Sequence, residues 1–252
     1  MSAATCLSVY VLTEDSSGDA HDTLVALLKR SFRLVDSACQ TQRVRFLPGE
    51  PQERAAMAGN LWKARQGRAR QASVDLARGI ATRLLQAATE PTFVVIHVDG
   101  DRAWSAQHTS ENVKKLDALL AKQVKGSLLQ HHKGDEQAVQ SALGRVLRVF
   151  PFYSVEAWLY QNIAEAQRIC AVLGAPPKLV DQLAAWRDDP GALDEITTLK
   201  DSCALGGEHN RRLAQQWPAP KARSVGKSYA AFVDELEACT PLVDALNTTW
   251  SA

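Results

Sequence analysis

Short apolar runs alternate with helical patterns through most of the chain. The segments 7–12, 44–47, 93–98 and 145–150 are rich in β-branched or aromatic residues, and turn formers follow the first three of them, which predicts strands. The segment 93–98 is nearly all apolar, as expected of a strand that is buried on both faces of its sheet.

Helices are expected between and after these strands. Apolar residues recur at helical spacing around 24–32 and over 110–122, and an Ala- and Arg-rich composition favours a helix over 53–88. Candidate breaks in the last of these segments are Gly59, Gly67 and Gly79. Because strands alternate with helices, we expect an α/β fold with a largely parallel sheet flanked by helices.

The later part of the chain is expected to be mostly helical. Residues 154–169 predict a helix with Ser154 as its N-cap, and 227–246 predict a last helix bent at Pro241, whereas Gly126 to Asp135 have the composition of a loop. This pattern divides the chain into an α/β core, residues 1–170, and a mostly helical C-terminal region, residues 171–252, that packs on the core.

Acidic residues stand where the predicted strands end. Glu14 follows the first strand, Asp99 and Asp101 follow the strand 93–98, and Glu156 follows the strand 145–150. Because residues i and i+2 of an extended chain point the same way, Asp99 and Asp101 can face one cavity. Functional groups of parallel sheets gather at these strand ends, and ligands that offer only oxygen suit Mg²⁺ or Mn²⁺. These four carboxylates therefore predict a metal site.

The same residues also have a simpler interpretation. Asp99-Gly100-Asp101 is a common tight turn with solvated aspartates, and Glu156 in a first helical turn can simply favour the helix dipole by ~0.3–1 kcal/mol. His97, inside its strand, is interpreted as a core histidine that could also support a site at Asp99.

Overall charge and composition exclude several classes of protein. The formal net charge is +1, which is not typical of a globally basic nucleic-acid coat protein or of a disordered chain. The five cysteines are widely spaced and form no CxxC pair, which favours a reducing compartment over a disulfide scaffold or a zinc site. With no signal peptide and no apolar stretch long enough to cross a bilayer, we expect a cytoplasmic protein without membrane contact.

Basic residues nevertheless cluster locally, and such clusters can contact phosphates. One basic segment runs from Arg54 to Arg83 and includes Lys63, and another runs from Arg211 to Lys227. The candidates for nucleic-acid binding are Arg65, Arg68, Arg70, Arg211 and Arg212. The alternative is that these side chains form a solvated helix face.

The chain resembles a known family in the order of its motifs. Strand–Glu14–helix followed by Val95-Ile-His-Val-Asp99-Gly-Asp101 resembles the Toprim fold of topoisomerases, primases and OLD-type nucleases. Ser154-Val-Glu156-Ala-Trp158-Leu159 and Gly226-Lys227-Ser228 resemble segments of small stand-alone Toprim-like proteins of bacterial anti-phage defence systems.

The resemblance implies a metal-dependent nuclease. Glu14, Asp99, Asp101 and Glu156 would hold Mg²⁺ or Mn²⁺ and act in catalysis, and Lys227 would neutralise the scissile phosphate. DNA would be the substrate, and an ABC-type or OLD-type ATPase would be the controlling partner, since the chain has no Walker A motif of its own. Assembly of the chain into a homo-oligomer is left as an open alternative.

The chain departs from the family pattern directly after Glu14, where Asp15 stands in place of glycine. This departure raises the possibility that Asp15 or Asp19 acts as a ligand. It also leaves an alternative function open, a catalytically inactive Toprim-like adaptor that assembles a complex. A phosphatase or sugar transferase that uses the Asp99-Gly100-Asp101 motif is a weaker alternative, because the residues after it do not fit those families.

Overall fold

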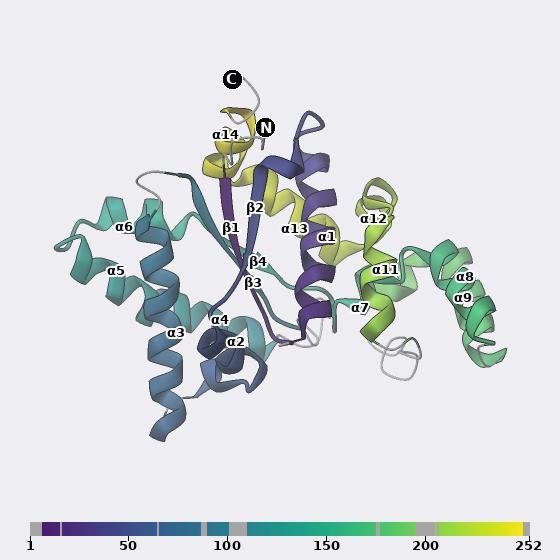
Figure 1. Ribbon diagram of the computed structural model, residues 1–252, viewed down its shortest axis with the longest axis horizontal. Coiled ribbons are helices and arrows are strands. Elements are labelled where there is room, and N and C mark those ends of the chain that lie inside the picture. The colour runs from purple at the N-terminus through teal and green to yellow at the C-terminus, as the bar shows by residue number, and fades with distance from the viewer. Residues whose placement is uncertain are drawn as a thin grey trace.

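The computed structural model describes most of the chain (Figure 1). The described residues are 7–15, 17–64, 66–86, 90–100, 110–174, 177–194, 205 and 207–248. They contain a four-stranded sheet in the order β2-β1-β3-β4, in which every neighbouring pair is parallel. The strands are β1 (Leu7–Thr13), β2 (Val44–Pro48), β3 (Thr92–His97) and β4 (Val146–Val149). The predicted α/β class, with a parallel sheet flanked by helices, is confirmed.

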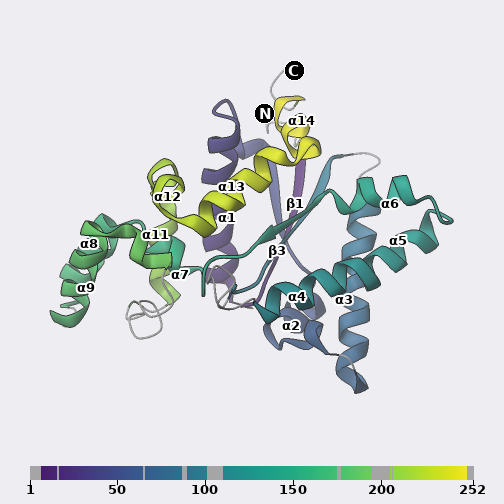
Figure 2. The ribbon, with the colours of Figure 1, turned by 180° about the vertical axis from the view of Figure 1, so that it is seen from behind.

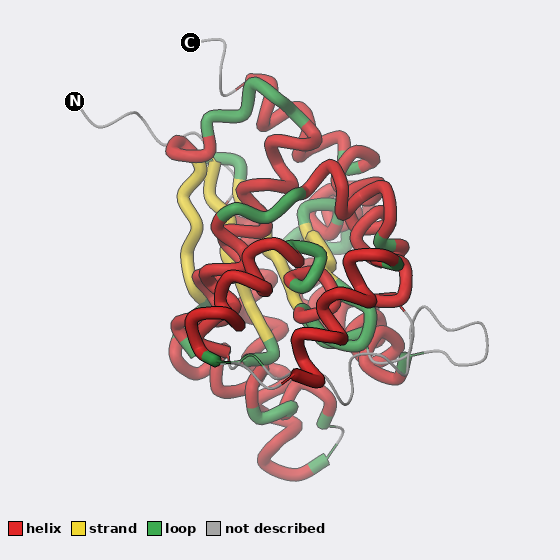
Figure 3. Tube along the Cα trace, turned by 90° about the vertical axis from the view of Figure 1, so that its right-hand side faces the viewer, coloured by secondary structure: helices red, strands yellow, loops and turns green. Residues whose placement is uncertain are grey.

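Helices cover both faces of the sheet, as Figure 1 and the reverse view in Figure 2 show. One face carries α1 (Gly18–Val35) and α13 (Lys227–Ala238). The other face carries α2 (Pro51–Ala58), α3 (Gly67–Leu85) and α4 (Glu111–Ala118). Helices make up most of the traced chain in the side view of Figure 3.

The central strand β3 contributes to an apolar core on each face. Val95 packs with α1 and the C-terminal helices, whereas Val94 and Ile96 pack with α2, α3 and α4. All three side chains are fully buried. Because successive residues of a strand point to opposite faces, a strand covered on both sides is apolar throughout, which explains the continuous run that marked this strand in the sequence.

The order of the strands creates a crevice between β1 and β3. The chain leaves β1 through α1 on one face and reaches β2, and it returns to β3 through α2 and α3 on the other face. Connections therefore depart in opposite directions from the carboxyl ends of β1 and β3. In open parallel sheets, such a switch point is where ligands bind.

The long helix expected over 53–88 is divided where two of its three glycines stand. It breaks between α2 and α3, at Gly59 and Gly67, but Gly79 lies inside α3. A β-carbon at Gly79 would collide with the carboxylate of Glu53, which forms a buried ion pair with Arg83. The missing side chain of Gly79 thus makes room for that pair.

The loop predicted over Gly126 to Asp135 is wrong up to His131 and is limited to the short turn at residues 132–135. Helix α4 continues through a π-helical segment, Leu119–Val124, into α5 (Lys125–His131), and α6 (Glu136–Leu143) follows after a short turn. Val124 and Leu128 are buried four residues apart. Their burial outweighs the low helix propensity of the glycine between them.

The C-terminal half contains more helix breaks than predicted. The helix expected over 154–169 is two helices, α7 (Glu156–Leu159) and α8 (Ile163–Leu173), and Val155 rather than Ser154 occupies the N-cap position of α7. The last helix ends at Ala238, and α14 (Thr240–Thr248) begins anew with Pro241 in its first turn, where proline is tolerated.

The remaining helices are α9 (Pro177–Asp188), α11 (Asn210–Gln215) and α12 (Ala219–Val225). An aromatic cluster joins the C-terminal helices to α7: Trp158 contacts Tyr229 and Phe232, and Trp217 contacts Tyr229. The Tyr229 hydroxyl lies 3.0 Å from the Ser31 hydroxyl of α1. The C-terminal helices therefore share one apolar core with the first strand and helix. Among the described helices, none is both long and apolar enough to cross a membrane.

Substitution of Gly79 tests the role of its missing side chain. Gly79→Ala should lower the free energy of unfolding by about 1–3 kcal/mol, because overpacking displaces the Glu53 carboxylate from Arg83. Gly126→Ala is the matched control, since it lies in a helix with open space around it and should gain up to about 1 kcal/mol. Urea denaturation measures both, and an equal gain in the two variants would contradict the packing argument.

Tyr229 gives the fold a defined response to alkaline pH. Burial raises the pKa of Tyr229 to about 12, above the ordinary value of 10.0, so the folded state favours the neutral phenol. This contribution is complete below pH 10 and is lost as pH rises toward 12, at up to about 1.4 kcal/mol per pH unit. Denaturation between pH 9 and 11.5 should show this loss in the wild type and a shallower decline in Tyr229→Phe. Parallel pH curves would show that the burial of Tyr229 has no such effect.

Candidate functional site

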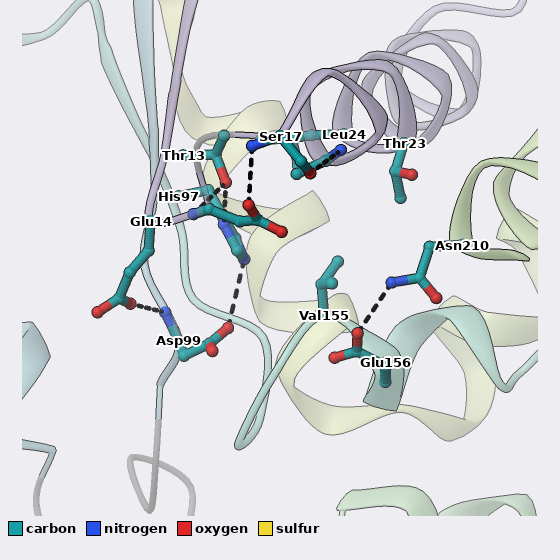
Figure 4. Close-up of a pocket in the computed structure, with 12 residues that line it drawn as sticks. Thr13, Glu14, Ser17, Thr23, Leu24, His97, Asp99, Val155, Glu156 and Asn210 are labelled. Carbon is teal, nitrogen blue, oxygen red and sulfur yellow. Dashed lines mark hydrogen bonds and ion pairs between the residues drawn. The ribbon is translucent and has the colours of Figure 1, made fainter. Parts of the chain in front are cut away.

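A cavity of about 190 Å³ lies at the carboxyl ends of β1 and β3, at the switch point of the sheet. Its walls come from the end of β1, the start of α1, the end of β3, the start of α7 and α11. The lining residues are Thr13, Glu14, Asp15, Ser17, Ala20, Thr23, Leu24, His97, Asp99, Val155, Glu156 and Asn210. Residues far apart in the sequence, including three of the predicted metal ligands, therefore share one hollow (Figure 4).

Glu14 holds the ends of β1 and β3 together. Its Oε2 accepts a hydrogen bond from the backbone N–H of Asp99 at 2.9 Å, and its Oε1 accepts one from Lys63 Nζ, also at 2.9 Å. The Glu14 side chain is only 16% exposed and that of Lys63 18%, so the ion pair is largely shielded from water. Both oxygens of Glu14 are thus engaged within the protein.

Asp99 begins the loop that follows β3. Its backbone is fixed by Glu14 and by Asn112, whose side-chain amide donates to the Asp99 carbonyl at 2.9 Å. Its carboxylate turns toward His97, as Figure 4 shows, with Oδ1 3.7 Å from His97 Nε2. The side chain is 40% exposed, so Asp99 connects the buried histidine with the opening of the cavity.

His97 is buried and has a hydrogen-bond partner at one nitrogen. Its Nδ1 lies 3.0 Å from the Thr13 hydroxyl, whereas Nε2 has no hydrogen-bond partner among the described residues. Burial lowers the pKa of His97 to about 4, against the opposing effect of the nearby carboxylates of Glu14, Glu156 and Asp15. The imidazole is therefore neutral at physiological pH, which is the form that binds metals.

Glu156 and Asp15 complete the acidic wall. Glu156, in the first turn of α7, accepts a hydrogen bond at 2.9 Å from the side-chain amide of Asn210, which lies in α11. Asp15 Oδ1 accepts from the backbone N–H of Ser17, the N-cap residue of α1, at 2.8 Å. In the part of the chain that the structure describes, the other carboxylate oxygen of each residue has no hydrogen-bond partner.

Three of the four residues predicted to bind a metal lie around one cavity. Glu14, Asp99 and Glu156 line the same cavity, whereas Asp101 lies outside the described residues. Within the described ranges, no three His, Cys, Asp or Glu side chains form a group that could hold a metal ion. The suggested substitute ligand Asp15 lines the cavity, and Asp19 is not among its lining residues.

The predicted basic residues are more dispersed. Lys227 is exposed at the start of α13 and does not line the cavity. Arg65 and the side chain of Arg68 lie outside the described residues, and Arg70 is exposed near the start of α3. Arg212 forms an ion pair with Glu165 of α8.

Arg211 is exposed beside the cavity residue Asn210 and pairs with Asp22 at 3.1 Å. Two further members of the basic segment 54–83 have internal roles: Lys63 binds Glu14, and Arg83 is buried against Glu53. Of the candidates whose side chains are described, Arg211 is therefore the one that lies next to the acidic cavity.

Sequence reasoning missed three polar partners of the site. These are Asn112, Asn210 and Lys63. Each binds a residue at least 13 positions away, so no local sequence pattern indicates the contact. No protein-family model matches the chain, and no match is found among curated proteins or solved structures. The resemblance to Toprim proteins therefore stays a prediction.

The Glu14–Lys63 pair can be tested by a double-mutant cycle. Lys63→Met should lower the free energy of unfolding by about 1–3 kcal/mol, because it leaves a shielded carboxylate with one hydrogen bond. Adding Glu14→Gln should cost less than the sum of the two single changes, since the pair is already broken. Additive losses would indicate that the two side chains do not interact in solution.

Proposed function

We propose that the chain is a divalent-metal-dependent hydrolase of phosphodiester bonds, a nuclease that acts on DNA. One observation carries the proposal. At the switch point of a parallel sheet, a buried imidazole nitrogen to which the described residues supply no hydrogen bond faces a carboxylate in a cavity with further acidic residues. An unsatisfied buried nitrogen is costly, and a cation is a partner that would satisfy it.

The spacing of the His97 and Asp99 side chains supports this proposal. His97 Nε2 and Asp99 Oδ1 are 3.7 Å apart, and two atoms bound to one ion at ~2.1 Å each are separated by roughly 3–4 Å. Glu156 and Asp15 each keep an oxygen for which the described residues supply no hydrogen bond, and Asp101 is two residues beyond Asp99 in the sequence. Mg²⁺ or Mn²⁺ bound there would polarise a phosphoryl oxygen and activate water.

The protein groups around this pair would support it. Thr13 orients the imidazole through Nδ1, as partners of metal-binding histidines generally do. Glu14 fixes the Asp99 backbone, and Lys63 balances the Glu14 charge, which lowers the repulsion among the carboxylates of the cavity. Asn210 orients Glu156, whose remaining oxygen can bind the ion or accept a proton from water.

Metal binding is the primary test. Isothermal titration calorimetry of Mn²⁺ and Mg²⁺ should show binding to the wild type, tighter for Mn²⁺ because imidazole nitrogen suits Mn²⁺ better than Mg²⁺. Asp99→Asn should weaken the binding of both ions by about 100-fold, and His97→Gln should mainly reduce the preference for Mn²⁺. Asp181→Asn, an exposed aspartate in α9, is the control. Failure of the wild type to bind either ion at millimolar concentration would refute the proposal.

Cleavage of supercoiled plasmid and of single-stranded DNA tests the reaction itself. Asp99→Ala combined with Asp101→Ala should reduce Mn²⁺-dependent cleavage by about 100-fold or more, with thermal melting as the check on folding. Because the resemblance suggests control by an ATPase partner, the assay is run with and without the product of the neighbouring gene. Full activity of the double variant would contradict the assignment.

The engaged state of Glu14 favours a second candidate, an adaptor without catalytic activity. Both Glu14 oxygens accept hydrogen bonds, one from Lys63 and one from the Asp99 backbone, so this residue has a structural role at the ends of the strands. An adaptor predicts an intact fold and partner assembly with no ion bound, which the same calorimetric titration distinguishes.

A further inference from the structure

We propose that a basic groove beside the acidic cavity binds the phosphodiester backbone of a nucleic acid and leads it to the metal site. The groove lies between α1 and α11, with a volume of about 330 Å³. Its charged residues are Asp22, Lys29, Arg30, Arg33 and Arg211. The inference rests on the proposed function, and it assigns phosphate binding to three residues of α1 that no sequence motif marked.

Within the described residues, the α1 cations of the groove have no acidic partner. Lys29, Arg30 and Arg33 form no ion pair with a carboxylate of the described residues, whereas Arg148 and Arg223 elsewhere each pair with two carboxylates. Asp22 is the one acidic side chain among the groove-lining residues, and it pairs with Arg211. The groove therefore carries an excess of positive charge in a protein whose formal net charge is only +1.

Neutral contacts hold these cations in place. Arg30 donates to the backbone carbonyl of Gln215 at the end of α11, and Arg33 donates to the Thr41 hydroxyl at 3.1 Å. Lys29 Nζ lies 5.6 Å from the centre of the Phe46 ring. A guanidinium has five N–H donors, so each arginine keeps donors for a ligand, and its fixed position lowers the entropy lost on binding.

The groove and the acidic cavity are adjacent on the same two helices. Thr23 lines the cavity and Asp22 lines the groove; Asn210 lines the cavity and Arg211 lines the groove. From Thr23, α1 rises by roughly 9–15 Å to the level of Lys29 through Arg33, at ~1.5 Å per residue. Phosphates of one DNA strand are spaced ~3.4 Å along the duplex axis, so a backbone in the groove would reach the cavity within a few nucleotides.

This placement favours a nucleic acid over other anions. Lys29 and Arg33 are four residues apart on one helix, roughly 6 Å along its axis, which suits successive phosphates better than one small anion. An acidic peptide would satisfy the same charge, but it gives no reason for the groove to adjoin a cavity suited to phosphodiester hydrolysis.

The test is fluorescence anisotropy of a labelled 20-mer DNA in EDTA, so that metal binding plays no part. Lys29→Gln/Arg33→Gln should weaken binding by roughly 10- to 50-fold at 0.1 M salt. It should also make the negative slope of log K against log salt shallower by ~1.4–1.8. Lys178→Gln/Arg187→Gln is the matched control: it removes the same charge from α9, which supplies no described residue to either hollow, and it should bind like the wild type. Thermal melting verifies the fold of both variants.

The outcomes separate this inference from the proposed function. An equal loss of affinity in both variants, or no loss in either, would overturn the assignment of the groove as the DNA-binding site. Displacement of the 20-mer by millimolar inorganic phosphate would indicate a small-anion site, and preferential binding of a poly-glutamate peptide would indicate a protein partner; either result would also overturn it. If the wild type binds DNA through Lys29 and Arg33 but binds no Mn²⁺, the groove stands and the nuclease proposal falls.

Discussion

The arrangement of the cavity depends on the two contacts of the Glu14 carboxylate. One of its oxygens holds the Asp99 backbone, which fixes the first residue after β3 against the end of β1. The other binds Lys63, which brings the segment between α2 and α3 to the same place. With the Asp99 backbone held in this way, its carboxylate lies beside His97 rather than in open solvent. Loss of this contact would remove one of the hydrogen bonds that fix the Asp99 backbone.

Helix α1 connects the two candidate sites on the molecule. Its first turns line the acidic cavity, and its later turns carry the lysine and arginines of the basic groove. Its buried face packs on the sheet through Leu24, Leu28 and Phe32, so the polar faces are held on a rigid element. A substrate that spans both hollows would meet positive charge along its backbone and acidic ligands at its end. Such a division of charge would suit the proposed binding of a phosphate backbone beside a metal site.

The parallel sheet could be predicted from the sequence because strand burial on both faces leaves a continuous apolar run, as in 93–98. Once the strands are predicted, Glu14 and Asp99 are identified as site candidates because they stand at carboxyl ends of strands. The extent of the helices could not be predicted. Burial of Val124 and Leu128 carries a helix through an expected loop, and Gly79 lies inside α3, where it leaves space for Glu53. The Lys63 and Asn210 contacts depend on tertiary packing alone. For the same reason, Lys63 and Arg83 were expected in a basic patch although both bind acidic residues of the fold.

The central claim is that a divalent cation binds between His97 and Asp99. Anomalous X-ray diffraction from crystals soaked in Mn²⁺, recorded on both sides of the manganese absorption edge, tests it most directly. The account predicts an anomalous peak within bonding distance of His97 Nε2 and an Asp99 carboxylate oxygen. The absence of such a peak from the cavity would contradict it, whether or not manganese is detected at another place in the crystal.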